Sequence, residues 1–239
     1  MTDGRLSDVS FLQKGAGKDL LFLHGYLSSK EAFTAQINYF SRFYRVTAID
    51  FLGFGQSAPL EKPFSVGDYA EWTKGVIDAL GLKNPHVIAH SFGCRVAVKM
   101  AQNSPNTFDK ILLTGSAGII VKRGFSYRFK VRAYRFVKRF AKNFAERKFG
   151  SAEYRSLSPI MKESYKKIVN EDLRVTAQGV QNRVLIVQGK EDKTTTLQEA
   201  EIYLQHFPSA RLRQMAGGHF AFAQHPLAFN LIAEEFFYE

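Results

Sequence analysis

The stretch Val87-Ile88-Ala89-His90-Ser91-Phe92-Gly93 decides the expected fold. It runs from an apolar, β-branched segment into a serine with small residues two positions before and two after it, Ala89 and Gly93, and then into a segment with helical spacing. A serine on so tight a strand-to-helix turn has a strained backbone, and only small residues at those two places avoid a clash. The stretch therefore predicts a nucleophile elbow at Ser91. The alternative is a serine that merely caps the following helix.

Apolar runs rich in β-branched residues alternate with helical spacing on both sides of this turn. That alternation is typical of an α/β fold, with a mainly parallel central sheet flanked by helices. We expect strands at residues 20–23, 45–49, 86–89, 110–113, 183–187 and 210–215, an antiparallel edge strand at 9–12, and helices at 30–43, 65–80, 92–102, 197–206 and 227–237.

Two later loops carry the groups that would activate a serine. Gly189-Lys190-Glu191-Asp192 follows the apolar run at 184–187, and Ala216-Gly217-Gly218-His219-Phe220 follows the last expected strand. A serine hydroxyl is a poor nucleophile at neutral pH unless a base lies within hydrogen-bond reach and a third group orients that base. The order Ser, Asp, His along the chain is the one that an elbow of this kind requires. The sequence therefore predicts Ser91 as nucleophile, His219 as general base and Asp192 as the orienting acid.

Other residues compete for these roles. His90 adjoins the serine but points away from it at an elbow, and His206 and His225 lack a glycine-rich loop. Glu191 is an alternative to Asp192. After the expected strand at 110–113, the stretch 114–118 contains no carboxylate, so no acid is expected there.

The chain resembles the α/β-hydrolase superfamily, in its capped esterase or lipase-like branch, over nearly the whole length outside one insertion. The resemblance rests on the elbow, on Leu23-His24-Gly25-Tyr26 and on Asp50-Phe51-Leu52-Gly53-Phe54-Gly55-Gln56-Ser57. It implies an oxyanion hole formed by the backbone N–H groups of Tyr26 and Phe92. The family's glycine three residues before the acid favours Asp192 over Glu191. It also implies a small-molecule ester or thioester as substrate, cleaved through an acyl-enzyme without a cofactor.

The insertion, residues 119–175, is expected to be a helical cap between core segments 1–118 and 176–239. It holds 16 Lys and Arg against 5 Asp and Glu, so it accounts for the whole net charge of +11. A first helix is expected around Tyr127 to Phe144 and a second at 159–169. Its charge and aromatic residues favour an apolar pocket with a cationic rim, or peripheral contact with an anionic membrane surface. Candidate substrate contacts are His24, Gly25, Arg95, Tyr127 and Tyr134.

Two further functions stay open on the sequence. Arg95, four residues after the serine, resembles an arginine of pyruvate-eliminating enzymes in menaquinone synthesis, which favours a lyase. Ligand receptors on the same fold can also keep the whole triad.

Composition and residue spacing bear on the expected location and on metal and nucleic-acid binding. A single cysteine, Cys94, and no signal-peptide pattern or membrane-span run in the 239 residues predict a cytoplasmic protein. No group of His, Cys or acidic residues has metal-ligand spacing, so no metal is expected. Nucleic acid is not an expected partner, because the basic residues gather in one insertion and no reading motif is present. The oligomeric state is not predicted.

Overall fold

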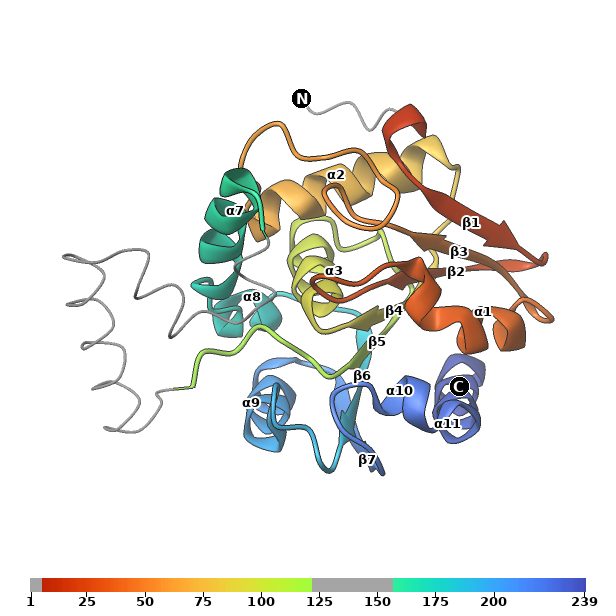
Figure 1. The fold of residues 1–239 in the computed structure, drawn as a ribbon. Coiled ribbons are helices and arrows are strands. Elements are labelled where there is room, and N and C mark those ends of the chain that lie inside the picture. Colours follow the sequence, from red (N-terminus) through yellow and green to blue (C-terminus); the bar gives the residue numbers. More distant parts are fainter. Residues whose placement is uncertain (1–5, 122–156) are drawn as a thin grey trace.

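The computed structural model describes residues 6–121 and 157–239, and these form one seven-stranded sheet flanked by helices (Figure 1). The strand order is β1-β3-β2-β4-β5-β6-β7, with β1 antiparallel to β3 and every other pairing parallel. The α/β-hydrolase fold predicted from the sequence is therefore confirmed. The strands are β1 Phe11–Lys14, β2 Lys18–Leu23, β3 Tyr44–Ile49, β4 His86–His90, β5 Lys110–Thr114, β6 Arg183–Gly189 and β7 Ala210–Met215.

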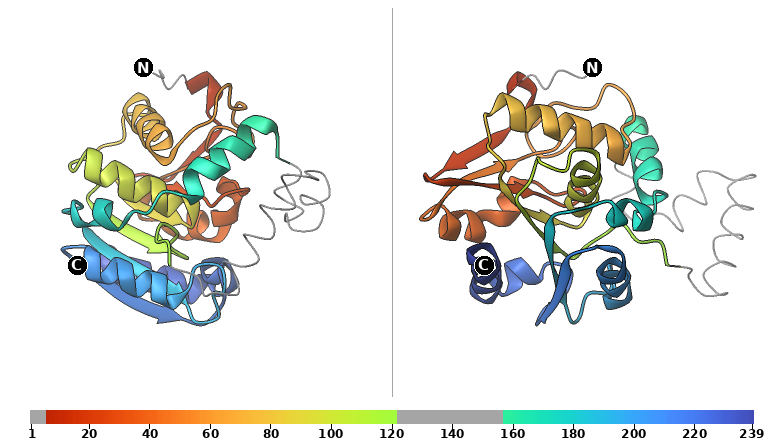
Figure 2. Two further views of the ribbon diagram at one scale, coloured as in Figure 1. Left: turned by 90° about the vertical axis from the view of Figure 1, so that its left-hand side faces the viewer. Right: turned by 180° about the vertical axis from the view of Figure 1, so that it is seen from behind.

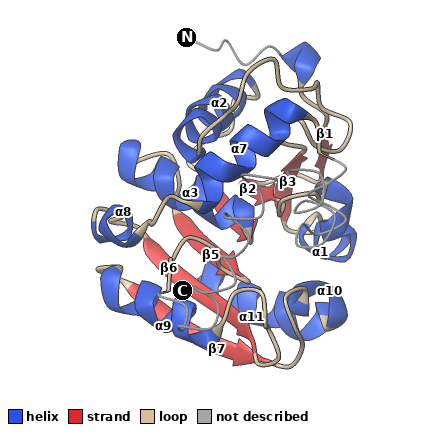
Figure 3. Cartoon of the chain, turned by 60° about the vertical axis from the view of Figure 1, so that its left-hand side comes forward, coloured by secondary structure: helices blue, strands red, loops and turns tan. Residues whose placement is uncertain are grey.

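Helices cover both faces of the sheet (Figures 1 and 3). Neighbouring residues of β4 show why: Val87 and Ala89 belong to one buried cluster and Ile88 to the other, because successive strand residues point to opposite faces. The cluster around Val87 contacts α2, α3, α7, α8 and α9, and the one around Ile88 contacts η2, α1, α10 and α11. The helices are η1 Leu6–Asp8, η2 Lys30–Phe33, α1 Thr34–Phe40, α2 Val66–Ala79, α3 Phe92–Asn103, α7 Pro159–Val169, α8 Arg174–Gln178, α9 Leu197–His206, α10 Ala221–Gln224 and α11 Pro226–Tyr238.

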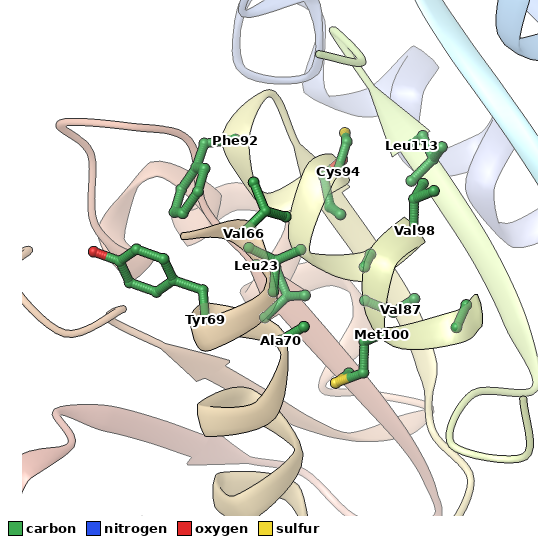
Figure 4. Close-up of a cluster of buried hydrophobic side chains, with 14 of the residues drawn as sticks. Leu23, Val66, Tyr69, Ala70, Val87, Phe92, Cys94, Val98, Met100 and Leu113 are labelled. Atoms are coloured by element: carbon green, nitrogen blue, oxygen red, sulfur yellow. The ribbon is translucent and has the colours of Figure 1, made fainter. Parts of the chain in front are cut away.

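The helix that begins at the elbow lies in the middle of the first cluster (Figure 4). Cys94 and Val98 of α3 pack toward Leu113 of β5, while Phe92 lies near Tyr69 of α2. All five side chains are buried. The helix that follows the nucleophile elbow is therefore anchored in a buried apolar cluster.

Several expected elements differ from the structure by one or two residues at an end, and two differ in more than that. The helix expected at 30–43 is a 3₁₀ turn, η2, followed by α1. Asp50 accepts hydrogen bonds from both the Lys30 backbone N–H and its ammonium group, at 2.7 Å each, which fixes the first turn to the loop after β3. The edge strand expected at 9–12 begins at Phe11 instead, since the Val9 N–H bonds back to Leu6 and the Val9 side chain is buried.

Part of the insertion lies within the described residues. Helix α7 has the bounds expected for the second cap helix, and Figure 2 shows it beside α2 and α3 from two further sides. The helix expected around Tyr127 to Phe144 lies outside the described residues, and the core and cap boundaries stay predictions. Among the helices of the described part, none combines the length and apolar character needed to cross a bilayer.

Candidate active site

Ser91 lies between β4 and α3 with φ 50° and ψ −109°, a left-handed conformation that residues with a side chain rarely adopt. The turn is held by a hydrogen bond from the Ser91 N–H to the Thr114 carbonyl, at 3.1 Å. A Cβ on Gly93 would lie 2.3 Å from the Leu23 carbonyl oxygen, so only glycine lets α3 start this close to β2. Such strain, of order 1–3 kcal/mol, persists where the surroundings over-determine the conformation. The backbone is that of a nucleophile elbow.

His219 reaches the serine from the loop after β7. Its Nε2 lies 3.0 Å from Ser91 Oγ, and its Nδ1 lies 2.9 Å from Asp192 Oδ2. The ring sits against Gly115, where an added Cβ would lie 3.1 Å from Nδ1 and 3.0 Å from the His219 carbonyl oxygen. The structure thus brings together the three residues that the sequence singled out, from three separate loops, with His219 lying 128 residues after Ser91 and 27 after Asp192.

Asp192 is a buried carboxylate whose oxygens face donors. Oδ1 accepts from the backbone N–H groups of Thr194 and Thr195, at 2.8 and 3.0 Å. Oδ2 accepts from the Thr195 hydroxyl at 2.8 Å, beside the His219 ring. Burial opposes ionisation of this carboxyl, but the hydrogen bonds from His219 and Thr195 outweigh burial and lower its pKa to about 2. Asp192 is therefore a fixed negative charge at neutral pH.

Thr195 was not among the residues singled out from the sequence. Its hydroxyl lies 3.2 Å from His219 Nδ1 as well as 2.8 Å from Asp192, and the side chain is buried. An aspartate side chain commonly accepts a backbone N–H two residues further along in a turn, as Asp192 does from Thr194. That local pattern does not specify a hydroxyl at residue 195, so no signal in the sequence singled out Thr195.

Glu191 serves a different purpose from Asp192. Its Oε2 accepts from the Gly217 N–H at 2.6 Å, while its own N–H donates to the Gly217 carbonyl at 3.0 Å. A Cβ on Gly189 would lie 2.3 Å from the Gly218 carbonyl oxygen, so the acid loop and the histidine loop touch through their backbones. Glu191 joins these two loops and does not face the His219 ring nitrogens.

His90 is buried behind the site. Its Nε2 lies 2.9 Å from the His219 carbonyl oxygen, which can only accept, so Nε2 carries the proton and donates. Burial lowers the pKa of His90 to about 3, and the ring is neutral. His90 thus holds the backbone of His219. His206 bonds the Ile202 carbonyl on α9, and His225 is an exposed residue at the start of α11.

The two expected oxyanion donors lie on neighbouring loops. Phe92 is the first residue of α3, where helix N–H groups have no partner within the helix. Tyr26 lies in the turn closed by the Ser28 N–H on the Gly25 carbonyl, at 3.3 Å. The Tyr26 and Phe92 rings meet edge to face with centroids 5.7 Å apart, and a Cβ on Gly25 would lie 3.4 Å from Ser91 Cβ. The Gly25–Tyr26 turn therefore borders the serine.

Of the other candidate substrate contacts, His24 and Arg95 are buried and bonded to backbone groups. His24 is fully buried and bonds two backbone groups, the Gly25 carbonyl and the Phe51 N–H. Arg95 is buried, and its Nη1 donates to the carbonyls of Ile168 and Glu171, at 2.9 and 2.8 Å. Tyr127 and Tyr134 lie outside the described residues.

Helix α7 is bonded to the core along its length. The Tyr26 hydroxyl donates to the Met161 carbonyl at 3.2 Å, and the buried Ser164 hydroxyl accepts from the Phe64 N–H at 2.8 Å. With the Arg95 bonds at its carboxyl end, these contacts make α7 a fixed wall beside the elbow. Within residues 6–121 and 157–239, no three His, Cys, Asp or Glu side chains are grouped as metal ligands.

Comparison with curated proteins identifies hydrolases among the relatives. The chain is 26% identical over 217 residues to a 2-hydroxymuconate semialdehyde hydrolase of Pseudomonas putida, covering 82% of this chain and 77% of that protein. It is 30% identical over 96 residues to an (E)-2-((N-methylformamido)methylene)succinate hydrolase of Acinetobacter baylyi, covering 40% of this chain and 36% of that protein. The aligned region thus spans only about a third of the second relative.

Solved structures show the same fold at low identity. An esterase from Exiguobacterium antarcticum superposes with a TM-score of 0.76 at 21% identity, covering 97% of this chain and 96% of that one. A bacterial membrane phospholipase A superposes with a TM-score of 0.79 at 18% identity, covering 96% of this chain and 82% of that one. The family model described as alpha/beta hydrolase fold matches residues 19–175, so the chain belongs to the α/β-hydrolase family.

Proposed function

We propose that this protein is a serine hydrolase that cleaves a carboxylic ester, or a thioester, through an acyl-enzyme on Ser91. The observation that carries the proposal is the unbroken chain of contacts from Ser91 Oγ to His219 Nε2, at 3.0 Å, and from His219 Nδ1 to Asp192, at 2.9 Å. These are hydrogen-bond distances for nucleophile, base and orienting acid. Esterases among the similar folds and hydrolases among the relatives support the reaction class.

In the proposed reaction, Ser91 Oγ attacks the ester carbonyl carbon while its proton passes to His219 Nε2. The carbonyl oxygen becomes an oxyanion that accepts from the Tyr26 and Phe92 N–H groups, each worth roughly 3–4 kcal/mol toward the transition state. The tetrahedral intermediate then expels the alcohol, which takes the proton from Nε2, and leaves an ester on Ser91. Water attacks this ester with His219 as base, releasing the acid and restoring the serine.

Asp192 has two parts in this scheme. It accepts the Nδ1 proton of His219, which leaves Nε2 free to receive the serine proton. Its low pKa, about 2, keeps it ionised while His219 is transiently positive, so the ion pair stabilises the imidazolium.

The lyase alternative loses its main support. It depended on Arg95 as a substrate contact, and the Arg95 guanidinium is instead buried, with Nη1 bonded to two backbone carbonyls at the end of α7. The receptor alternative differs in turnover, because a receptor would hydrolyse few molecules whereas an enzyme cycles.

The test is hydrolysis of p-nitrophenyl esters from acetate to laurate, with 2-hydroxymuconate semialdehyde as a separate substrate, by the protein and by its Ser91→Ala variant. We expect repeated turnover of esters that the variant lacks. Absence of turnover in both folded proteins would contradict the proposal and favour a receptor.

Contact with an anionic membrane surface is a secondary proposal, supported by the charge of residues 119–175. We expect the protein to float with vesicles containing anionic lipid and not with neutral ones; equal recovery would contradict it. The cytoplasm, the proposed location, is supported by the single cysteine, and cell fractionation tests it.

A further inference from the structure

His24 is the residue directly after β2, and both of its ring nitrogens bond the backbone. Nδ1 lies 2.7 Å from the Gly25 carbonyl oxygen, and Nε2 lies 3.0 Å from the Phe51 nitrogen. The side chain is fully buried between the Phe51 and Phe54 rings, at centroid distances of 4.9 and 5.7 Å. His24 is thus fixed by contacts from two loops.

These partners decide where the ring proton lies. The Phe51 N–H can only donate, so Nε2 must be the bare, accepting nitrogen. Burial lowers the pKa of His24 to about 4, so the ring is neutral and its one proton is on Nδ1. Nδ1 therefore donates to the Gly25 carbonyl.

The carbonyl of Gly25 and the N–H of Tyr26 are the two ends of one planar peptide group. Fixing the carbonyl therefore fixes the direction of the Tyr26 N–H. The Gly25 oxygen also accepts from the Ser28 N–H at 3.3 Å. Donors on a carbonyl polarise the peptide and make its N–H a stronger donor, since hydrogen bonds in a chain strengthen one another.

The loop after β3, which contacts His24 through Phe51, is fixed by hydrogen bonds of its own. Phe51 follows Asp50, a fully buried carboxylate that accepts from the Lys30 N–H, the Lys30 ammonium and the Gln56 N–H, at 2.7, 2.7 and 3.0 Å. The loop from His24 to Lys30 is therefore tied at both ends to the loop after β3.

We propose that His24 is a positioning residue for the oxyanion hole, which aims and polarises the Gly25–Tyr26 peptide through its Nδ1 proton. The inference rests on the proposed hydrolase function, because it assigns a purpose to the Tyr26 N–H. His24 acts through this peptide and does not touch the substrate. The Phe51 N–H selects the tautomer that makes the donation.

Two variants separate the bonds. In His24→Asn, the side-chain NH₂ takes the place of Nδ1 and keeps the donation to Gly25. In His24→Gln, the amide oxygen takes the place of Nε2, so the Phe51 bond is kept and the donation is lost. His206→Asn, a histidine on α9 away from the site, is the matched control.

We expect His24→Gln to lower kcat on a p-nitrophenyl ester on the order of tenfold with little change in KM, because a weakened oxyanion donor acts in the transition state. His24→Asn should retain several times more kcat than His24→Gln, although both lose one buried bond. Equal losses in the two variants, or losses that follow thermal stability alone, would overturn the proposal. His206→Asn should match the unaltered protein.

A measurement that needs no variant separates this inference from the proposed function. Histidine ring ¹⁵N spectra of the unaltered protein give the tautomer of His24 directly. A proton on Nδ1 supports the positioning role of His24 even if no ester is hydrolysed. A proton on Nε2 overturns that role even if esters are turned over. Labelling of Ser91 by a fluorophosphonate tests the hydrolase function separately.

Discussion

The loop after β6 and the loop after β2 both aim donors at negative charge, but the charges differ. Asp192 carries a permanent charge, and two backbone N–H groups, one hydroxyl and one imidazole surround it. The Gly25–Tyr26 turn is assigned to a charge that would exist only during the reaction. Its donor, the Tyr26 N–H, must therefore be kept in position before any anion is present. The first loop is fixed by what it binds, and the second by His24 and Asp50 behind it.

Neutralising Asp192 should have the largest effect on kcat. In Asp192→Asn, the amide oxygen would accept from the Thr194 and Thr195 N–H groups and turn the NH₂ toward His219, placing the imidazole proton on the wrong nitrogen. We expect kcat to fall by about 10⁴-fold in an ester assay. Glu191→Gln, the neighbouring acid, should stay within a few fold. Equal losses would contradict the assignment of Asp192.

Crowding the second loop should have the next largest effect. A Cβ on Gly25 would lie 2.8 Å from His90 Nδ1, so Gly25→Ala must move the turn or the ring. We expect a loss of kcat of about 10²-fold and of stability of about 1–3 kcal/mol in urea unfolding. Gly67→Ala in α2, where the nearest atom would lie 3.6 Å away, should keep its activity. Unchanged kinetics of Gly25→Ala would contradict the close packing of the turn.

Thr195→Val tests a finer feature of the first loop. The variant keeps the backbone N–H on Asp192 but removes the hydroxyl, so the pKa of Asp192 should rise and kcat should fall on the order of tenfold, as a buried hydrogen bond to a charged group is typically worth about 1.5–3 kcal/mol. Thr194→Val, whose exposed side chain gives Asp192 only its N–H, is the control. Steady-state kinetics that do not distinguish the two variants would show that the hydroxyl is dispensable.

The comparison extends to pH. Burial lowers the pKa of His24 and of His86 to about 4, below their ordinary value of 6.5. The unfolded chain therefore binds more protons between about pH 6.5 and 4, and stability should fall as pH falls through that window. His86 stacks on Phe237 with centroids 4.6 Å apart, so His86→Phe keeps the packing and removes one titrating group. The slope of unfolding free energy against pH should drop by up to about 1.4 kcal/mol per pH unit; an unchanged slope in urea titrations would contradict this.

Much of the fold could be predicted because its signals are local. Helix α9, helix α7 and strand β7 have the bounds expected from the spacing of apolar residues alone. The elbow was also readable, since strain at a serine requires small neighbours within two residues. The 3₁₀ turn η2 was not, and its first residue, Lys30, is held by Asp50, a partner twenty residues away in sequence.

The candidate site divides in the same way. Ser91, Asp192 and His219 follow from loop motifs and chain order. The orientation of Arg95 toward α7 and the two backbone bonds of His24 depend on distant carbonyl and amide groups, about which side-chain identity says nothing. Folding brings Glu171 to Arg95 and Phe51 to His24.

The most direct test of the central claim is the site at which a fluorophosphonate attaches, located by peptide mass spectrometry. The account predicts a single adduct on Ser91, absent from Ser91→Ala and formed far more slowly in His219→Ala. An adduct on another residue, or undiminished labelling of Ser91→Ala, would contradict it.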